Sequence, residues 1–173
     1  MPWAAAAGGP RYCDLKRSPE LLRNLEEVQR FPELGEFLAA VNSPASFIET
    51  AKCDAWSSTE TNPEEEIFEA THKFGGYIDC LFSDSKARFL FSQNEQFVQQ
   101  LTQLLRRVPE MPAAAEFLVR RCYYHEAETI RDGFYVTLYL FGYGDDETQA
   151  RRQWAIALKL VENAIRQMSA QAR

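Results

Sequence analysis

The most regular pattern in the chain is an alternation of side chains near its C-terminal end. Residues 134–141 read Phe-Tyr-Val-Thr-Leu-Tyr-Leu-Phe, and a period of two is typical of a β-strand. Residues 77–82 alternate in the same way, and a turn-forming segment separates them from a second alternating run over 87–91. This pattern predicts a β-hairpin. A strand over 117–124 and a loop over 126–132 lead into the 134–141 strand, which predicts a second hairpin.

Four stretches carry apolar residues at helical spacing. The first begins at Ser18, which can act as an N-cap, and Pro32 separates it from a short second helix that ends at Asn42. Asn94 is expected to cap the third helix. The last helix should span about 22 residues and bury one face. Its apolar seam consists of Trp154, Leu158, Val161, Ile165 and Met168, widened by Ile156 and Leu160.

Two stretches between these elements fit more than one pattern. Residues 45–56 have apolar residues at helical spacing that also fall on one side of a strand, and we favour the strand. Residues 62–75 begin with Asn62-Pro63 and three glutamates, which favours a helix that Gly75 ends, with a strand as the alternative. The ambiguous apolar residues of the first stretch are Phe47, Ala51, Cys53 and Ala55.

The order of elements is therefore hairpin, helix, hairpin, helix, after a helical N-terminal third. Antiparallel hairpins with helices against one face form an α+β sandwich of two layers. We expect a flexible tail over residues 1–14 and a single α+β domain over residues 15–173. Its antiparallel sheet would consist of two β-hairpins, each followed by a helix.

Composition narrows the class of protein. The 173 residues are 46% hydrophobic and carry a net charge of −6, which excludes disorder for most of the length and provides no basic field for a nucleic-acid backbone. No apolar run approaches the ~20 residues that span a bilayer, and the N-terminal residues do not form a signal-peptide pattern. We therefore expect a cytoplasmic protein that binds neither nucleic acid nor membrane. The four cysteines form no CxxC pair and are expected to be free thiols.

Two glycines and three acids stand where the last strand meets the last helix. Gly142 and Gly144 precede Asp145, Asp146 and Glu147. A GxGxxG phosphate loop would need a third glycine in place of Glu147, and acids would repel an anion at the helix N-terminus. A tight turn and an N-cap explain the same residues, so we expect no nucleotide site.

The segment around His125 was considered for catalysis and metal binding. An imidazole beside Glu126 and Glu128 could bind a metal or transfer protons. Zinc needs further converging ligands, however, and a charged loop that closes a hairpin is the interpretation we favour. Cys122 and His125 would point to opposite faces of a strand. The chain contains no GxSxG or HExxH motif. We expect no catalytic residue, no metal and no cofactor, and interpret the chain as non-enzymatic.

One arginine of the pair Arg120-Arg121 must share a sheet face with apolar neighbours, because consecutive strand residues point to opposite sides. A structural salt bridge to Asp79 or Glu116 is the interpretation we favour. Binding of a carboxylate or phosphate of a partner is the alternative.

The second face of the expected sheet is aromatic and amphipathic. If helices cover the aliphatic face, this face is open, and Tyr and Arg are typical of interface hot spots. Alternatively, the N-terminal helices fold back and cover it. Its expected residues are Tyr77, Asp79, Tyr135, Thr137, Tyr139 and one arginine of the 120–121 pair.

Two functions follow from these expectations. The first is a protein-binding, assembly or chaperone-like domain, as a homodimer, that binds a protein partner through the aromatic face. The second is a small-molecule-binding protein or enzyme with a pocket between the sheet and the N-terminal helices, lined by Arg121, Tyr123, His125 and Tyr135. The candidate surface for either consists of Tyr77, Asp79, Arg121, Tyr123, His125, Tyr135 and Tyr139.

No motif identifies a family. The order of elements over residues 76–170 is similar to that of small acidic proteins that dimerise and chaperone a partner, such as type III secretion chaperones. The resemblance implies a dimer that binds protein, and it carries over no functional residue.

Overall fold

One four-stranded antiparallel sheet forms the centre of the molecule. The structure, a computed structural model, describes residues 13–60, 65, 69–126 and 129–171. The strands are arranged in the order β1-β2-β4-β3, so β1 and β3 are the edges. Their bounds are β1 Ile48–Ser58, β2 His72–Phe82, β3 Ala113–Glu126 and β4 Thr129–Gly144.

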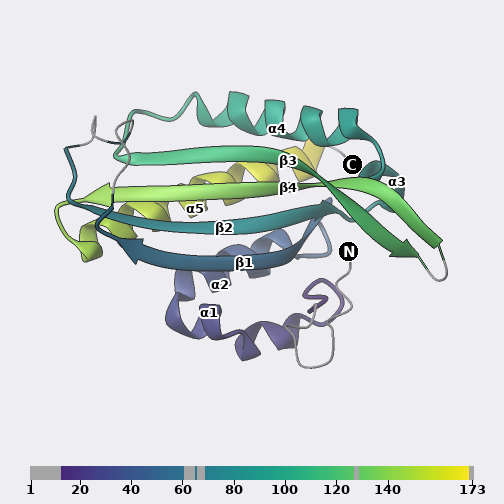
Figure 1. The fold of residues 1–173 in the computed structure, drawn as a ribbon, viewed down its shortest axis with the longest axis horizontal. Coiled ribbons are helices and arrows are strands. Elements are labelled where there is room, and N and C mark those ends of the chain that lie inside the picture. Colours follow the sequence, from purple (N-terminus) through teal and green to yellow (C-terminus); the bar gives the residue numbers. More distant parts are fainter. Residues whose placement is uncertain (1–12, 61–64, 66–68, 127–128, 172–173) are drawn as a thin grey trace.

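The helices form a second layer on one face of the sheet. Figure 1 shows the long α5 passing behind the strands, and α2 contacts both α5 and β1. Buried Ile78, Leu138 and Leu140 from the central strands pack with Trp154 and Leu158 of α5 in one core cluster. The helical elements are η1 Pro19–Asn24, α1 Glu26–Arg30, α2 Pro32–Val41, α3 Ser85–Arg88, α4 Phe91–Leu105 and α5 Glu147–Gln171. The expected α+β fold with a helical N-terminal segment is confirmed.

The start of α5 follows the capping expected from the sequence. The Asp146 carboxylate accepts a hydrogen bond from the Gln149 amide at 2.8 Å, and the Gln149 side chain accepts one from the Asp145 amide at 2.9 Å. Asp146 is therefore the N-cap, and the arrangement resembles a capping box in which the Gln149 side chain bonds to the residue before the N-cap. Every residue of the expected seam is buried, whereas Ile156, expected to widen it, is 42% exposed. The prediction for Ile156 was therefore wrong, because this residue lies on the outer side of α5.

The N-terminal third is less regular than its apolar spacing suggested. The first expected helix is divided into the 3-10 helix η1 and the short α1, with Leu25 in an extended conformation between them. Ser18 makes no side-chain capping hydrogen bond. The second expected helix is confirmed as α2.

The favoured strand over residues 45–56 is confirmed as β1, with one irregularity. A bulge lies between Thr50 and Lys52. Because the bulge changes the alternation, Cys53 and Ala55 face the main core while Ala51 packs in a separate cluster.

The helix expected over residues 62–75 was wrong where the structure describes it. β2 begins at His72, so Phe74 and Gly75 belong to a strand. Phe74 is 1% exposed and contacts Phe31 and Trp154 with ring centroids 5.3 and 4.8 Å apart. Core packing here outweighs the local helix-start signal. Residues 61–64 and 66–68, where that helix would begin, lie outside the described residues.

The first hairpin is β1–β2, and the expected strand over 87–91 was wrong. Asp84 caps the short α3 by accepting the Lys86 amide at 2.9 Å, and α4 begins at Phe91. Asn94, expected as a cap, lies inside α4 and donates to the carbonyls of Ala87 and Leu90 at 3.2 and 3.0 Å. The sheet still consists of two hairpins, each followed by a helix.

The second hairpin is longer than expected. β3 and β4 pair from Ala113↔Gly142 to Glu126↔Thr129, so the loop expected over 126–132 was wrong. Pairing between β2 and β4 ends at Cys80↔Val136. Beyond that point β3 and β4 continue as a two-stranded ribbon, visible at the lower right of Figure 1. We call this ribbon, residues 120–126 and 129–135, the hairpin arm.

Candidate binding face

The face of the sheet opposite the helical layer is the candidate site, and we call it the open face. Side chains alternate between the two faces along each strand. Ile78, Leu138 and Leu140 face the helices, so Tyr77, Asp79 and Tyr139 face the other way. No described helix crosses in front of the strands in Figure 1. The N-terminal helices pack against α5 and β1, so the alternative in which they cover this face is not what the described residues show.

A row of aromatic rings crosses the open face from β1 to β4. Ring centroids of Trp56 and Tyr77 are 6.5 Å apart, and those of the register partners Tyr77 and Tyr139 are 6.1 Å apart. Tyr139 stacks on Phe141 at 6.4 Å with an interplanar angle of 7°. All four side chains are partly exposed. We call Trp56, Tyr77, Tyr139 and Phe141 the aromatic row.

Gly75 makes room for two of these rings. It lies opposite Trp56 in β1 and opposite Phe141 in β4. A Cβ atom at this position would lie 2.7 Å from Phe141 Cδ1 and 3.4 Å from Trp56 Cζ2. The missing side chain therefore lets the rings converge from the two neighbouring strands.

A polar network lies beside the aromatic row. Thr137 Oγ1 donates to Asp79 Oδ1 at 2.7 Å, and Arg120 Nε donates to Thr137 Oγ1 at 3.1 Å. Arg120 Nη2 also donates to the Tyr139 hydroxyl at 3.2 Å, with the guanidinium 6.0 Å from the ring centroid. The salt bridge expected from Arg120 to Asp79 or Glu116 was therefore wrong, because Thr137 stands between the arginine and Asp79.

Asp79 is a buried carboxyl group on the open face, next to Thr137, which is also buried. It is 6% exposed, and no cation lies within ion-pair distance of it among the described residues. Burial raises the pKa of Asp79, and the hydrogen bond from Thr137 and the charges of Lys52 and Arg120 oppose this effect. Burial also raises the pKa of Tyr77 and Tyr135, and the nearby Asp79 charge adds to both shifts.

The structure divides the candidate residues between two surfaces. Tyr77, Asp79, Tyr135 and Tyr139 lie on the open face, with Arg120 rather than Arg121. The remaining three residues lie on the opposite side of β3, in the hairpin arm and exposed to solvent. There Arg121 forms a 3.5 Å ion pair with Asp132, and both side chains are mostly exposed. The residues on this second side are Arg121, Tyr123 and His125.

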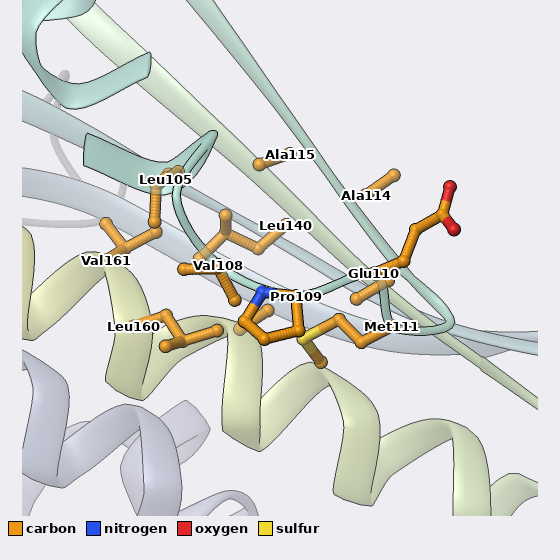
Figure 2. A pocket seen from close by; sticks show the side chains of 12 residues that line it. Leu105, Val108, Pro109, Glu110, Met111, Ala114, Ala115, Leu140, Leu160 and Val161 are labelled. Carbon is orange, nitrogen blue, oxygen red and sulfur yellow. The ribbon is translucent and has the colours of Figure 1, made fainter. Parts of the chain in front are cut away.

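An apolar pocket of about 240 Å³ lies away from the open face. Figure 2 shows Val108, Pro109 and Met111 of the α4–β3 connection next to Leu160 and Val161 of α5. Ala113 and Ala115 of β3 complete its wall next to the sheet edge. None of the four residues proposed from the sequence for a ligand pocket lines this one.

No metal centre is formed by the described residues. No three potential metal ligands converge in this part of the chain. None of the four cysteines forms a disulfide among the described residues, and burial raises the pKa of Cys53 to about 12. None of the described helices combines the length and apolar character needed to cross a bilayer.

Sequence reasoning missed four open-face residues in the first two strands: Asp54, Trp56, Lys73 and Gly75. The uncertain assignment of residues 45–75 hid them, because a residue can be placed on a face only once its strand is recognised. Trp56 follows Asp54 by two residues, and this spacing was the available signal for its position. A strand over residues 48–58 places both side chains on the same face. Lys73 lies 5.5 Å from the centroid of the Phe141 ring and pairs with Glu65 at 2.9 Å.

Comparison with known proteins adds no relative. No protein-family model matches the chain, and no curated protein or solved structure matches it either.

Proposed function

We propose that this chain is a non-enzymatic protein-binding and assembly domain that works as a homodimer and binds a protein partner through its open face. The aromatic row is the single observation that carries the proposal. An antiparallel sheet with one solvated face normally directs polar residues to water. Here the outward positions of the two central strands include Tyr77, Tyr139 and Phe141. Exposing a contiguous set of rings is unfavourable unless another surface covers them.

The chemistry of the open face fits a protein partner. Tyr, Trp and Arg are enriched in interface hot spots because each combines a large contact area with a polar group. Arg120 and Asp79 supply such polar groups beside the rings. The acids Asp54 and Asp79 on this face and the net charge of −6 argue against a nucleic-acid backbone.

The size of the face is also appropriate. Eleven-residue strands with a rise of ~3.3 Å and a spacing of ~4.8 Å give four strands an area of roughly 700 Å². A standard interface buries about 800 Å² on each partner. Leu81, Thr137 and Tyr143 on this face are buried, so the exposed part is smaller than the whole sheet and has the size of a small protein contact.

Comparative capture followed by titration tests the proposal. Immobilised wild type, the Tyr77→Ala/Tyr139→Ala variant and the Ile156→Ala variant are exposed to an extract of the cells that produce the chain. Ile156 is a matched control because it is exposed but lies on the helical side. A protein retained by wild type and by the control, and lost with the open-face variant, is then purified and titrated calorimetrically.

We expect the open-face variant to bind this protein about 30-fold more weakly, which corresponds to the loss of about 2 kcal/mol at a hot spot. The Ile156→Ala variant should bind like wild type. Equal affinities for the open-face variant and the control would contradict the proposal. The proposal would also be contradicted if the extract contained no protein that binds the control but not the open-face variant.

A further inference from the structure

β3 is a long sheet edge without a bulge, a proline or a lysine. It contains 14 residues without proline or glycine and pairs with β4 without a register shift. The other edge, β1, has a bulge next to Lys52. Bulges, prolines and edge lysines are the features that keep exposed edges from pairing with other strands. The two edges of this sheet are therefore not equivalent.

α4 runs along the outer side of β3 in Figure 1 and contacts this strand. α4 belongs to the helical layer, where Phe97 contacts Phe47 and Phe82 with ring centroids 5.7 and 5.9 Å apart. Among the described residues, the outward backbone of β3 makes one backbone hydrogen bond, from the Ala113 amide to the Met111 carbonyl at 2.7 Å, at the start of the strand. A row of backbone N–H and C=O groups that point away from the sheet is a template on which another strand can pair.

We propose that β3 pairs antiparallel with β3 of a second copy of this chain, about a two-fold axis that passes beside Leu118. In this register Glu116 lies opposite Arg120 of the other copy, twice, with both side chains on the same face. An axis at Arg120 or Arg121 would instead place an arginine opposite its own counterpart. The charge pattern of β3 is therefore complementary to itself in the Leu118 register.

The same register gives the apolar pocket an occupant. Tyr123 of one copy lies opposite Ala113 of the other, and both point to the helical side. Tyr123 is 63% exposed, and Ala113 lines the 240 Å³ pocket. A cavity of ~150 Å³ takes up a benzene ring, so this pocket has room for a tyrosine ring. The pocket wall labelled in Figure 2, including Val108, Met111 and Leu160, would surround it.

This inference deepens the homodimer part of the proposed function and rests on it. Pairing of the two edges joins two four-stranded sheets into one continuous sheet. Both open faces then lie on the same side, so the assembly presents two aromatic rows to a partner.

Native mass and site-specific cross-linking test the pairing. Wild type should have about twice the single-chain mass of 19.9 kDa by light scattering. Tyr123→Glu and Glu116→Arg each change an exposed side chain and should give folded monomers, with folding checked by circular dichroism. Leu118→Cys should form an intermolecular disulfide on mild oxidation, because residues directly opposite have Cβ atoms about 5 Å apart.

Two controls fix the register. Glu116→Cys should not cross-link, since four positions at ~3.3 Å separate the two cysteines by about 13 Å. Wild type carries the same four native cysteines and should not cross-link either. A dimer in which Leu118→Cys fails to cross-link would overturn the edge pairing and leave the homodimer intact. A wild-type monomer would overturn both, whereas binding through the open face is tested separately by the Tyr77→Ala/Tyr139→Ala variant.

Discussion

Two glycines on neighbouring strands distinguish the covered face of the sheet from the open face. At Gly142 in β4, an added Cβ would lie 2.2 Å from the Trp154 amide nitrogen and 2.3 Å from the Ala150 carbonyl oxygen. Both are backbone atoms of α5, so no side-chain rotation relieves the contact. At Gly75 in β2, the nearest atoms belong to the partly exposed ring of Phe141, at 2.7 and 2.9 Å.

The expected cost of Gly142→Ala follows from the movement that α5 must make. Ordinary carbon contacts are about 3.5 Å, so the helix must shift by roughly 1.2 Å. A gap of 0.5–1 Å already loses a quarter to a half of the dispersion energy across an interface. Because Trp154 and Leu158 are buried in this interface, we expect a loss near the upper end for overpacked cores, about 3 kcal/mol.

Gly75→Ala should cost much less. The Phe141 ring can tilt toward solvent on the open face, and replacing glycine within a strand recovers about 0.5–1 kcal/mol of conformational entropy. We therefore expect a net change in the free energy of unfolding within about 1 kcal/mol.

Urea denaturation followed by circular dichroism measures both variants against wild type. With about 2–4 °C per kcal/mol for a domain of this size, Gly142→Ala should also melt roughly 6–12 °C lower. Equal losses for the two variants would refute the reasoning, because they would mean that both faces are covered by backbone.

Three further predictions concern buried polar groups. Asp79→Asn should gain stability relative to wild type as the pH rises above about 4, because burial raises the folded-state pKa of Asp79 and penalises its ionised form; a pH-independent difference in urea unfolding would contradict this. Cys53 and Cys80 should react with a thiol reagent at pH 8 only after unfolding, since burial raises both thiol pKa values, that of Cys53 to about 12; fast modification of either thiol in the folded protein would be inconsistent. Asn42→Ala should lower the free energy of unfolding by about 3 kcal/mol, because the Asn42 carboxamide bonds to the Thr50 amide at 2.9 Å and to its hydroxyl at 2.8 Å; thermal unfolding at the wild-type temperature would count against it.

The sequence predicted a helix or strand correctly where one strong periodicity was present without a competing local signal. The 134–141 alternation and the seam from Trp154 to Met168 fixed the central strand β4 and the helix α5 that covers it. These two elements define which face of the sheet is open, so Tyr77 and Tyr139 could be assigned to a surface before the structure was known.

The first hairpin was misassigned because local signals competed with packing. Asn62-Pro63 and the following glutamates are typical of a helix start, but Phe74 is held in β2 by the ring contacts with Phe31 and Trp154. The alternation over 87–91 could not be distinguished from the edge of a helix, because Ala87 is buried against the sheet while Phe91 begins α4. Long-range contacts of this kind leave no periodic trace in the sequence.

The division of the candidate residues also depended on three-dimensional information. Neighbouring strand residues point to opposite faces, so Arg120 and Arg121 could not both belong to one site. Which of them joins Tyr139 is decided by the register of β3 on β4, where Arg120 lies opposite Tyr135. The length of the hairpin arm, which leaves Tyr123 exposed, likewise follows from the pairing of β3 with β4 as far as Glu126↔Thr129, where the sequence predicted a loop.

The most direct test of the central claim is hydroxyl-radical footprinting of the wild-type chain, alone and in complex with the partner obtained by capture. In the free chain, oxidation should reach Trp56, Tyr77 and Tyr139, since all three are partly exposed. In the complex, oxidation of these three side chains should fall several-fold, while oxidation of Ile156 on the helical side should be unchanged. Unchanged oxidation of the aromatic row together with protection of Ile156 would show that the partner binds the helical layer, and would contradict the account.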